Sequence, residues 1–209
     1  MTKQQQTFRR LVSLLLVFLM LMGVFGIMSI HVRSTRTDDW QQRRSALLVD
    51  AVNCLKNARH EDGSFGSYTG LVNETAEAAG AVRYAEPAYD TALTADWLRQ
   101  NGSRDNNDTA ARTAAAAGDQ DLLKELMTAQ NRDGGLGLRK NDGSDVLDTV
   151  LALQAVNDVS ITGYASQGSM LCEYLADNVQ SSGGWAYSSG SQTDTILTAM
   201  AVYNIARFM

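Results

Sequence analysis

The chain has 209 residues, enough for one ordinary domain or two small ones. With 44% hydrophobic and 20% charged residues its composition is globular, which excludes a wholly disordered chain. Residues 34–209 carry 14 basic and 23 acidic side chains, a net charge of −9 that would repel phosphate, so we expect no nucleic-acid partner. Two cysteines and two histidines leave little material for a metal site built from those residues.

Residues 11–32 form an apolar run without an acidic or basic side chain apart from His31. A bilayer core about 30 Å thick needs about 20 helical residues, so this run can cross a membrane. The basic residues 1–10 favour a cytoplasmic N-terminus. The sequence therefore predicts a single-pass anchor in the cytoplasmic membrane, a polar connector over residues 33–44 and an extracytoplasmic body over residues 45–209. A cleaved signal peptide and a secreted body are the alternative.

The body repeats one pattern of a helix, a glycine-containing loop and a second helix. Two weaker copies, at residues 51–85 and 89–118, come before two clearer ones, and together they make four units of about 45 residues each. Aligning Gly135 with Gly184 gives a period of 49 residues, and aligning Asp148 with Asp194 gives 46. The clearer copies read LLKELMTAQNRDGGLG with SDVLDTVLALQAV, and MLCEYLADNVQSSGGWAY with SQTDTILTAMAV.

The two helices of a unit differ in how they present apolar residues. Leading helices carry one apolar stripe, as around Leu122 and Leu126, which is typical of a helix with one face in water. Trailing helices such as residues 146–156 are apolar nearly all round and need protein on most sides. The pattern therefore predicts an outer and an inner layer of helices.

The loops contain helix stop and start signals. Gly134-Gly135 and Gly183-Gly184 permit the positive φ angles at which a helix ends and the chain reverses. The spacings Asp145-x-x-Asp148 and Ser191-x-x-Asp194 resemble capping boxes, with an oxygen acceptor at the N-cap and an acid at the third helical position. Local capping explains the recurring Asp-Thr pairs without catalysis.

At residues 130–137 and 180–187, each followed by Asp-Thr, the chain resembles the prenyltransferase and squalene cyclase repeat family. The resemblance covers about residues 47–209. It implies an all-α body in which about four αα-hairpins form a partial α/α toroid, behind one N-terminal transmembrane helix. The repeat motif is carried by Gln130, Asp133, Gly134, Gly135, Gly137, Asp148, Thr149, Gln180, Gly183, Gly184, Trp185, Asp194 and Thr195.

The catalytic signatures of that family do not match this chain. Its zinc enzymes use an Asp, a Cys and a His, whereas Cys54, His60 and Cys172 do not follow that pattern. Its cyclases protonate their substrate with the middle acid of an Asp-x-Asp-Asp-Thr motif, and Asn107 stands at that position here. We therefore assign no catalytic residue and predict no metal or other cofactor.

Four side chains near the repeat loops are candidates for binding a ligand, namely Trp185, Tyr187, Asp148 and Asp194. The aromatic rings can stack on a sugar or a peptide, although such rings more often fill the hairpin itself. Oxygen-rich loops can hold calcium, which is an alternative for a cluster of five residues. That cluster consists of Asn131, Asp133, Asp142, Asp145 and Asp148.

The sequence thus predicts a membrane-anchored binding module without catalysis. Helices at the ends of a stacked array expose apolar sides, which favours a protein partner, a cell-surface polymer or a homo-oligomer. The alternative is an enzyme, a hydrolase, lyase or cyclase, that acts on a glycan or an isoprenoid in the concave face. Two carboxylates facing one aromatic-lined cavity would favour the enzyme, and carboxylates directed at backbone amides would count against it.

Overall fold

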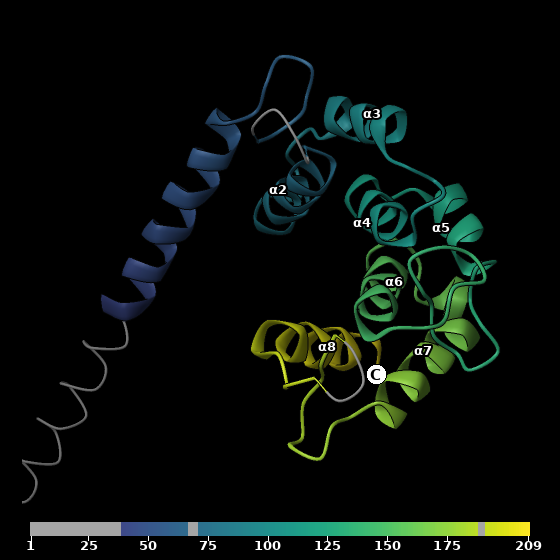
Figure 1. Cartoon of the computed structure of the whole chain (residues 1–209). Coiled ribbons are helices and arrows are strands. Elements are labelled where there is room, and N and C mark those ends of the chain that lie inside the picture. The colour runs from purple at the N-terminus through teal and green to yellow at the C-terminus, as the bar shows by residue number, and fades with distance from the viewer. Residues whose placement is uncertain (1–38, 67–70, 188–190) are drawn as a thin grey trace, which may run out of the picture. The chain divides into compact units, whose positions relative to one another are not determined.

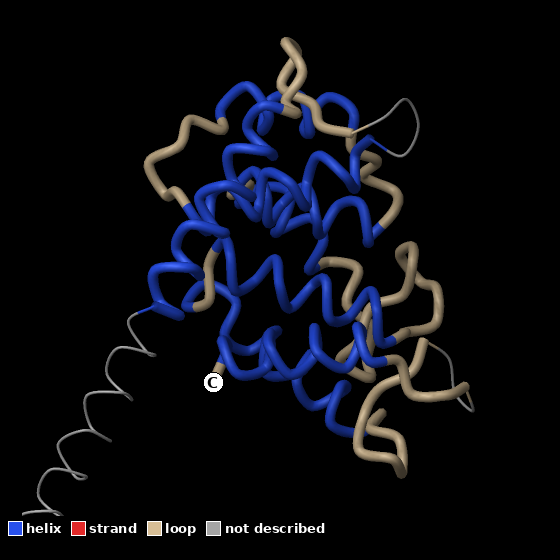
Figure 2. Tube along the Cα trace, turned by 90° about the vertical axis from the view of Figure 1, so that its left-hand side faces the viewer, coloured by secondary structure: helices blue, strands red, loops and turns tan. Residues whose placement is uncertain are grey.

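The computed structural model describes residues 39–66, 71–187 and 191–209, and within these ranges every regular element is a helix (Figures 1 and 2). The prediction of an all-α chain is confirmed for these residues. The predicted membrane segment, residues 11–32, lies outside them, and none of the described helices is both long and apolar enough to cross a bilayer. A first helix over residues 39–57 precedes α2 (Leu71–Ala85), α3 (Ala92–Asn101), α4 (Asn107–Ala117), α5 (Gln120–Met127), α6 (Val146–Val159), the 3-10 turn η1 (Thr162–Tyr164), α7 (Ala165–Asp177) and α8 (Thr195–Phe208).

The described part of the predicted connector is helical. The connector was expected over residues 33–44, and residues 39–44 belong to the first helix. Asp39, at the start of the described helix, suits the positive end of the helix dipole. The chain divides into two units between Ala51 and Val52, and helices α2 to α8 belong to the unit from Val52 onward.

The helices of that unit lie in two layers. The inner helices pack against one another in chain order, α2 against α4, α4 against α6 and α6 against α8. The outer helices α3, α5 and α7 each pack against the inner helices before and after them. Figure 1 shows α2, α4, α6 and α8 following one another along an arc, with α3, α5 and α7 outside it.

Burial follows the predicted difference between the layers. Helix α6 has ten buried residues, among them Leu151, Ala152 and Leu153, on all sides of the helix. The outer helix α5 buries a single stripe, Leu122, Leu123, Leu126 and Met127. Each large aliphatic side chain buried in this way contributes about 1.5–3 kcal/mol, so the centre of the array is held mainly by apolar packing.

Helix α8 is the exception among the inner helices. It buries only Leu197, Ala201 and Asn204, while Ile196 is 69% and Val202 55% exposed. Helix α6 covers one side of α8, and no further described helix covers the opposite side. The end of the array therefore exposes apolar surface, as expected for the last helix of a stack.

One hydrogen-bond arrangement recurs in three of the loops that precede an inner helix. A backbone N–H in the loop donates to a threonine hydroxyl one turn into the following inner helix: Phe65 to Thr75 at 2.9 Å, Leu136 to Thr149 at 3.0 Å and Trp185 to Thr198 at 3.0 Å. In each loop a glycine with φ between +86° and +91° comes two residues before that donor, at Gly63, Gly134 and Gly183. The loops are thus structural copies, and each is tied to the start of the inner helix that follows it.

The structure corrects the alignment of the two Asp-Thr pairs. Asp145 is the N-cap of α6 and accepts from the Asp148 amide, and Asp194 is the N-cap of α8 and accepts from the Leu197 amide. Asp194 therefore corresponds to Asp145, with the same period of 49 residues as the glycines. The predicted equivalence of Asp148 with Asp194 and the capping box starting at Ser191 are wrong, because a carboxylate placed one residue before the helix reaches its free amides directly.

The recurring threonine gives a first test of this loop. We expect Thr149→Val to lower the free energy of unfolding by about 1–3 kcal/mol, because it keeps the side-chain volume but leaves the buried Leu136 amide without an acceptor. Thr195→Val is the matched control, since Thr195 is exposed at the start of α8. Urea denaturation followed by circular dichroism measures both. Equal losses for the two variants would contradict the role given to Thr149.

Candidate functional site

The two aromatic residues proposed for ligand binding occupy different environments. Trp185 is buried, and its indole Nε1 donates to the Leu175 carbonyl at 2.8 Å. It therefore fills the hairpin between α7 and α8. Tyr187 is 51% exposed and lines a surface groove beside Tyr174 and Asp145. Of the two, only Tyr187 presents a ring to solvent.

Most of the proposed acidic residues are directed at backbone amides. Asp133 accepts from the Gly135 amide and from the Ser144 hydroxyl, and Asp142 accepts from the Arg139 amide. Asp145 and Asp194 cap their helices in the same way. This is the outcome that counts against a pair of catalytic carboxylates, because these oxygens already serve the loop.

The glutamines of the motif also serve structure. Gln130 Nε2 donates to the Gly134 carbonyl at 2.9 Å and to the Gln167 carbonyl of α7 at 3.1 Å, so it joins the loop to the next outer helix. The backbone N–H of Gln180 donates to the Gly184 carbonyl, and the backbone N–H of Asn131 makes the equivalent bond to the Gly135 carbonyl. The structural counterpart of Gln180 is therefore Asn131, one residue after the predicted partner.

Asp148 differs from the other acids. Its side chain is 3% exposed, and its Oδ1 atom has no hydrogen-bond partner among the described residues. Burial, followed by the adjacent Asp145 carboxylate, raises the pKa of Asp148 to about 8. Asp108 raises this pKa further and Arg112 lowers it. Asp148 is therefore a protonated acid near neutral pH, at the start of the central inner helix.

The residues considered for metals do not converge. In the described ranges no three His, Cys, Asp or Glu side chains are arranged to hold a metal ion. Cys54 is exposed, burial raises the pKa of the Cys172 thiol, and His60 Nε2 pairs with the Gly66 carbonyl. In the oxygen-rich cluster proposed for calcium, Asp133, Asp142 and Asp145 accept from backbone amides and Asn131 donates to the Asp142 carbonyl. Calcium binding by this cluster stays a prediction.

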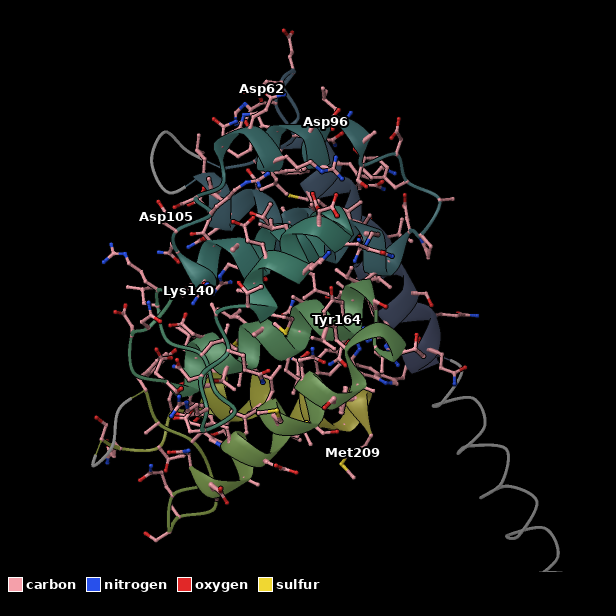
Figure 3. All side chains as sticks on the ribbon, turned by 90° about the vertical axis from the view of Figure 1, so that its right-hand side faces the viewer. Asp62, Asp96, Asp105, Lys140, Tyr164 and Met209 are labelled. Carbon is pink, nitrogen blue, oxygen red and sulfur yellow. The ribbon has the colours of Figure 1, made fainter. Side chains whose placement is uncertain are left out.

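The Asn106–Asn107 segment, which aligns with the acid motif of cyclases, is a structural turn. Asn106 caps α4 by accepting from the Thr109 amide. Asn107 is buried, and its Nδ2 donates to the Gly137 carbonyl at 2.7 Å, which ties the start of α4 to the loop before α6. Figure 3 shows Asp105 and Lys140 at this junction, where both line a shallow groove. The segment thus connects two repeats.

All four inner helices line a groove of about 590 Å³, which we call the inner groove. Small residues of α2 and α4 in its lining, among them Ala76 and Ala116, are buried and form its floor, whereas Tyr84 of α2 and Tyr203 of α8 are exposed. Tyr84 is 81% exposed and Tyr203 is 50% exposed. A volume of this size falls in the range of ligand sites in proteins, about 300–1,000 Å³.

Ion pairs line the inner groove. Arg207 lies 2.7 Å from Asp158, and its guanidinium also stacks on the Tyr203 ring at 5.5 Å from the centroid. Arg112 pairs with Glu77 of α2 and lies 2.5 Å from Asp108. These pairs fix planar hydrogen-bonding groups in defined orientations, because each guanidinium is held by a carboxylate.

Asn157 of α6 is the one lining residue with a buried polar atom that lacks a partner. Its side chain is 9% exposed, and Nδ2 donates to the Asn204 carbonyl at 2.9 Å, which fixes the amide. Its Oδ1 has no hydrogen-bond partner among the described residues. An unpaired buried acceptor costs about 1–3 kcal/mol, and because this oxygen is itself buried, the cost belongs to the packing of α6 against α8.

Sequence reasoning missed the inner groove. Its aromatic and charged residues lie at the ends of trailing helices, where Arg83-Tyr84 and Tyr203 interrupt otherwise apolar patterns. Those interruptions were the available signal, because an exposed tyrosine on an inner helix indicates a face that no other helix covers. The contiguous repeat motif indicated the loops instead.

Comparison with protein-family models gives no match for this chain, and comparison with curated proteins gives none either. The function must therefore be inferred from the geometry of the site.

Proposed function

We propose that the chain is a membrane-anchored binding module of the α/α toroid type, whose ligand occupies the inner groove. The anchor is the apolar segment 11–32, and the body from residue 45 onward lies outside the cytoplasm. The resemblance to the prenyltransferase and squalene cyclase repeat, the arc of inner helices and the exposed tyrosines support this proposal. The observation that carries it is the lining of the inner groove, to which all four inner helices contribute, with the exposed tyrosines Tyr84 and Tyr203 and the Arg207–Asp158 pair.

Binding is favoured over catalysis by the state of the acidic groups. The carboxylates in the groove, Glu77 and Asp158, are each held by an arginine. Among the acids of the loops, Asp145 and Asp194 cap helices, and Asp133 and Asp142 accept from groups of the loop itself. Asp148, the acid with a raised pKa, is 3% exposed and does not line the groove. A general acid must reach the substrate, so this arrangement favours a module that recognises its ligand without transforming it.

An isoprenoid ligand is disfavoured by the same lining. Three arginines, two carboxylates and two amide side chains face the groove. A hydrocarbon chain would remove these groups from water without supplying any hydrogen bond in return. The ligand we expect is therefore polar.

The proposal is tested with the full-length chain and one blocking substitution. A Cβ atom at Gly80, in the floor of the groove, would meet nothing within 4 Å, so Gly80→Trp fills the groove without a clash in α2. After an alkaline wash, which should leave the anchored chain in the membrane, the detergent-solubilised chain is sedimented with insoluble cell-envelope polymer. We expect Gly80→Trp to reduce the sedimented fraction at least fivefold.

Gly143→Trp is the matched control, because a Cβ atom there also meets nothing within 4 Å and Gly143 lies outside the inner groove. It should sediment like the unmodified chain. Equal sedimentation of the Gly80→Trp and unmodified chains would reject the inner groove as the binding site. Release of the chain by the alkaline wash would reject the anchor.

A further inference from the structure

The floor of the inner groove is formed by small side chains. On α2 it contains Ala76 and Gly80, and on α4 it contains Ala115 and Ala116. Peptide and protein ligands gain most of their affinity from large side chains inserted into pockets. A floor of alanine and glycine offers no such pocket, but it accommodates a flat ring.

The tyrosines at the sides of the groove can stack on that ring. Tyr84 is 81% exposed. The Arg207 guanidinium lies over the Tyr203 ring, 5.5 Å from its centroid, and Tyr203 is still 50% exposed. Aromatic side chains of this kind pack against the apolar faces of sugar rings.

The polar groups of the groove match hydroxyl groups better than a peptide backbone. The Arg207–Asp158 pair presents donors and acceptors side by side, and Gln154 adds an amide to the lining. A hydroxyl group can both donate and accept, so it can satisfy either. The helices lining the groove use their backbone N–H groups internally, so they offer no strand edge to which an extended peptide could add.

The charges of the groove do not favour a polyanion. Arg112 and Arg207 are each paired with carboxylates, and only Arg83 binds a neutral acceptor, the Ala116 carbonyl at 3.3 Å. The body as a whole carries a net charge of −9 over residues 34–209. A highly charged anionic chain would be repelled by that field.

From these observations we infer that the inner groove binds a neutral glycan chain, with sugar rings stacked on Tyr84 and Tyr203 and hydroxyl groups bonded to the Arg207–Asp158 pair. This inference rests on the proposed function and specifies the chemical class of its ligand.

The test compares three samples of the same insoluble envelope polymer, used with the full-length chain in detergent. One sample is untreated, one is digested with protease, and one is oxidised with periodate and then reduced with borohydride, which opens sugar rings without leaving reactive aldehydes. We expect periodate to lower the sedimented fraction of the chain at least fivefold and protease to change it less than twofold. Raising the salt to about 0.5 M should also change it less than twofold, because a neutral ligand is insensitive to screening.

Two tyrosine variants test the contacts. Tyr84→Ala removes a ring that is 81% exposed and should lower sedimentation with the untreated polymer at least fivefold while leaving the fold intact. Tyr187→Ala, the exposed tyrosine outside the inner groove, should change it less than twofold. A Tyr84→Ala chain that sediments like the unmodified one would overturn the stacking contact.

The outcomes separate the glycan inference from the proposed function. Binding that is blocked by Gly80→Trp but lost on protease digestion, or lost at high salt, would overturn the neutral glycan and leave the inner groove as the site of a protein or an anionic polymer. Binding that Gly80→Trp does not affect would overturn both.

Discussion

Replacing Asp148 by asparagine is expected to stabilise the fold at neutral and alkaline pH. The carboxyl group is 3% exposed, and burial together with the Asp145 carboxylate raises its pKa to about 8. Between pH 4 and 8 the native state therefore holds a proton that the unfolded state has released, so the free energy of unfolding falls as the pH rises through this window. At pH 8.5 the carboxylate costs the fold on the order of 3–5 kcal/mol.

Asparagine removes that cost because it has a similar shape, does not ionise, and can donate to Asp145 as the protonated acid does. We expect Asp148→Asn to exceed the unmodified chain in stability by about 3–5 kcal/mol at pH 8.5 and by about 1–2 kcal/mol at pH 5. Urea denaturation of residues 39–209 at several pH values measures the difference. Asp105→Asn, at an exposed carboxyl, is the control and should show no such trend. A difference for Asp148→Asn that stays constant with pH would show that its carboxyl is ionised in the native state at neutral pH.

The order of the helices could be predicted because each depends on neighbouring residues. The apolar pattern around α6 requires protein on most sides, and the structure buries Leu151 and Leu153 there. The double glycines mark where the chain reverses between an outer and an inner helix, and positive φ at Gly134 and Gly183 agrees with that reversal. The predicted helix ends at these glycines are wrong, because α5 already ends at Met127 and α7 at Asp177, each with a C-cap residue of negative φ. These features are local in the sequence, so a single chain reveals them.

The capping register could not be predicted correctly. Ser191, Asp194 and Thr195 all lie near the start of α8, and each residue type can cap a helix. The choice is fixed by the hydrogen bond from the Trp185 amide to Thr198, which comes from outside the helix. This contact sets the register of α8 and places Asp194 at the N-cap.

The inner groove depends on contacts between distant repeats. Glu77 meets Arg112, and Asn157 meets Asn204, although 35 and 47 residues separate the members of these pairs. No periodicity indicates which residues of four separate helices share one face of the arc. The repeat motif of the loops can be recognised because it is contiguous in the sequence. The groove forms only where the inner helices lie side by side.

Gly134→Ala and Gly183→Ala form a matched pair that tests whether the two repeat loops differ in packing. The two glycines have nearly the same backbone angle, φ +89° and +86°, and occupy equivalent positions 49 residues apart. A Cβ atom at Gly134 would lie 2.5 Å from the Met170 carbonyl oxygen, a backbone atom of α7, whereas one at Gly183 would meet nothing within 4 Å. Both variants suffer the strain of a positive φ, and only the first also displaces a helix.

We therefore expect Gly183→Ala to lower the free energy of unfolding by about 1 kcal/mol and Gly134→Ala to lower it by about 3 kcal/mol or more. For a body of this size the difference of about 2 kcal/mol corresponds to roughly 4–8 °C in Tm. Gly143→Ala, where the added atom meets nothing and φ is not positive, provides the baseline and should change stability by less than about 0.5 kcal/mol. The Gly183 variant carries the backbone strain alone. Equal losses of stability at the two glycines would therefore mean that the close approach of the loop to α7 does not stabilise the array. The outer layer would then be held by its apolar stripes instead.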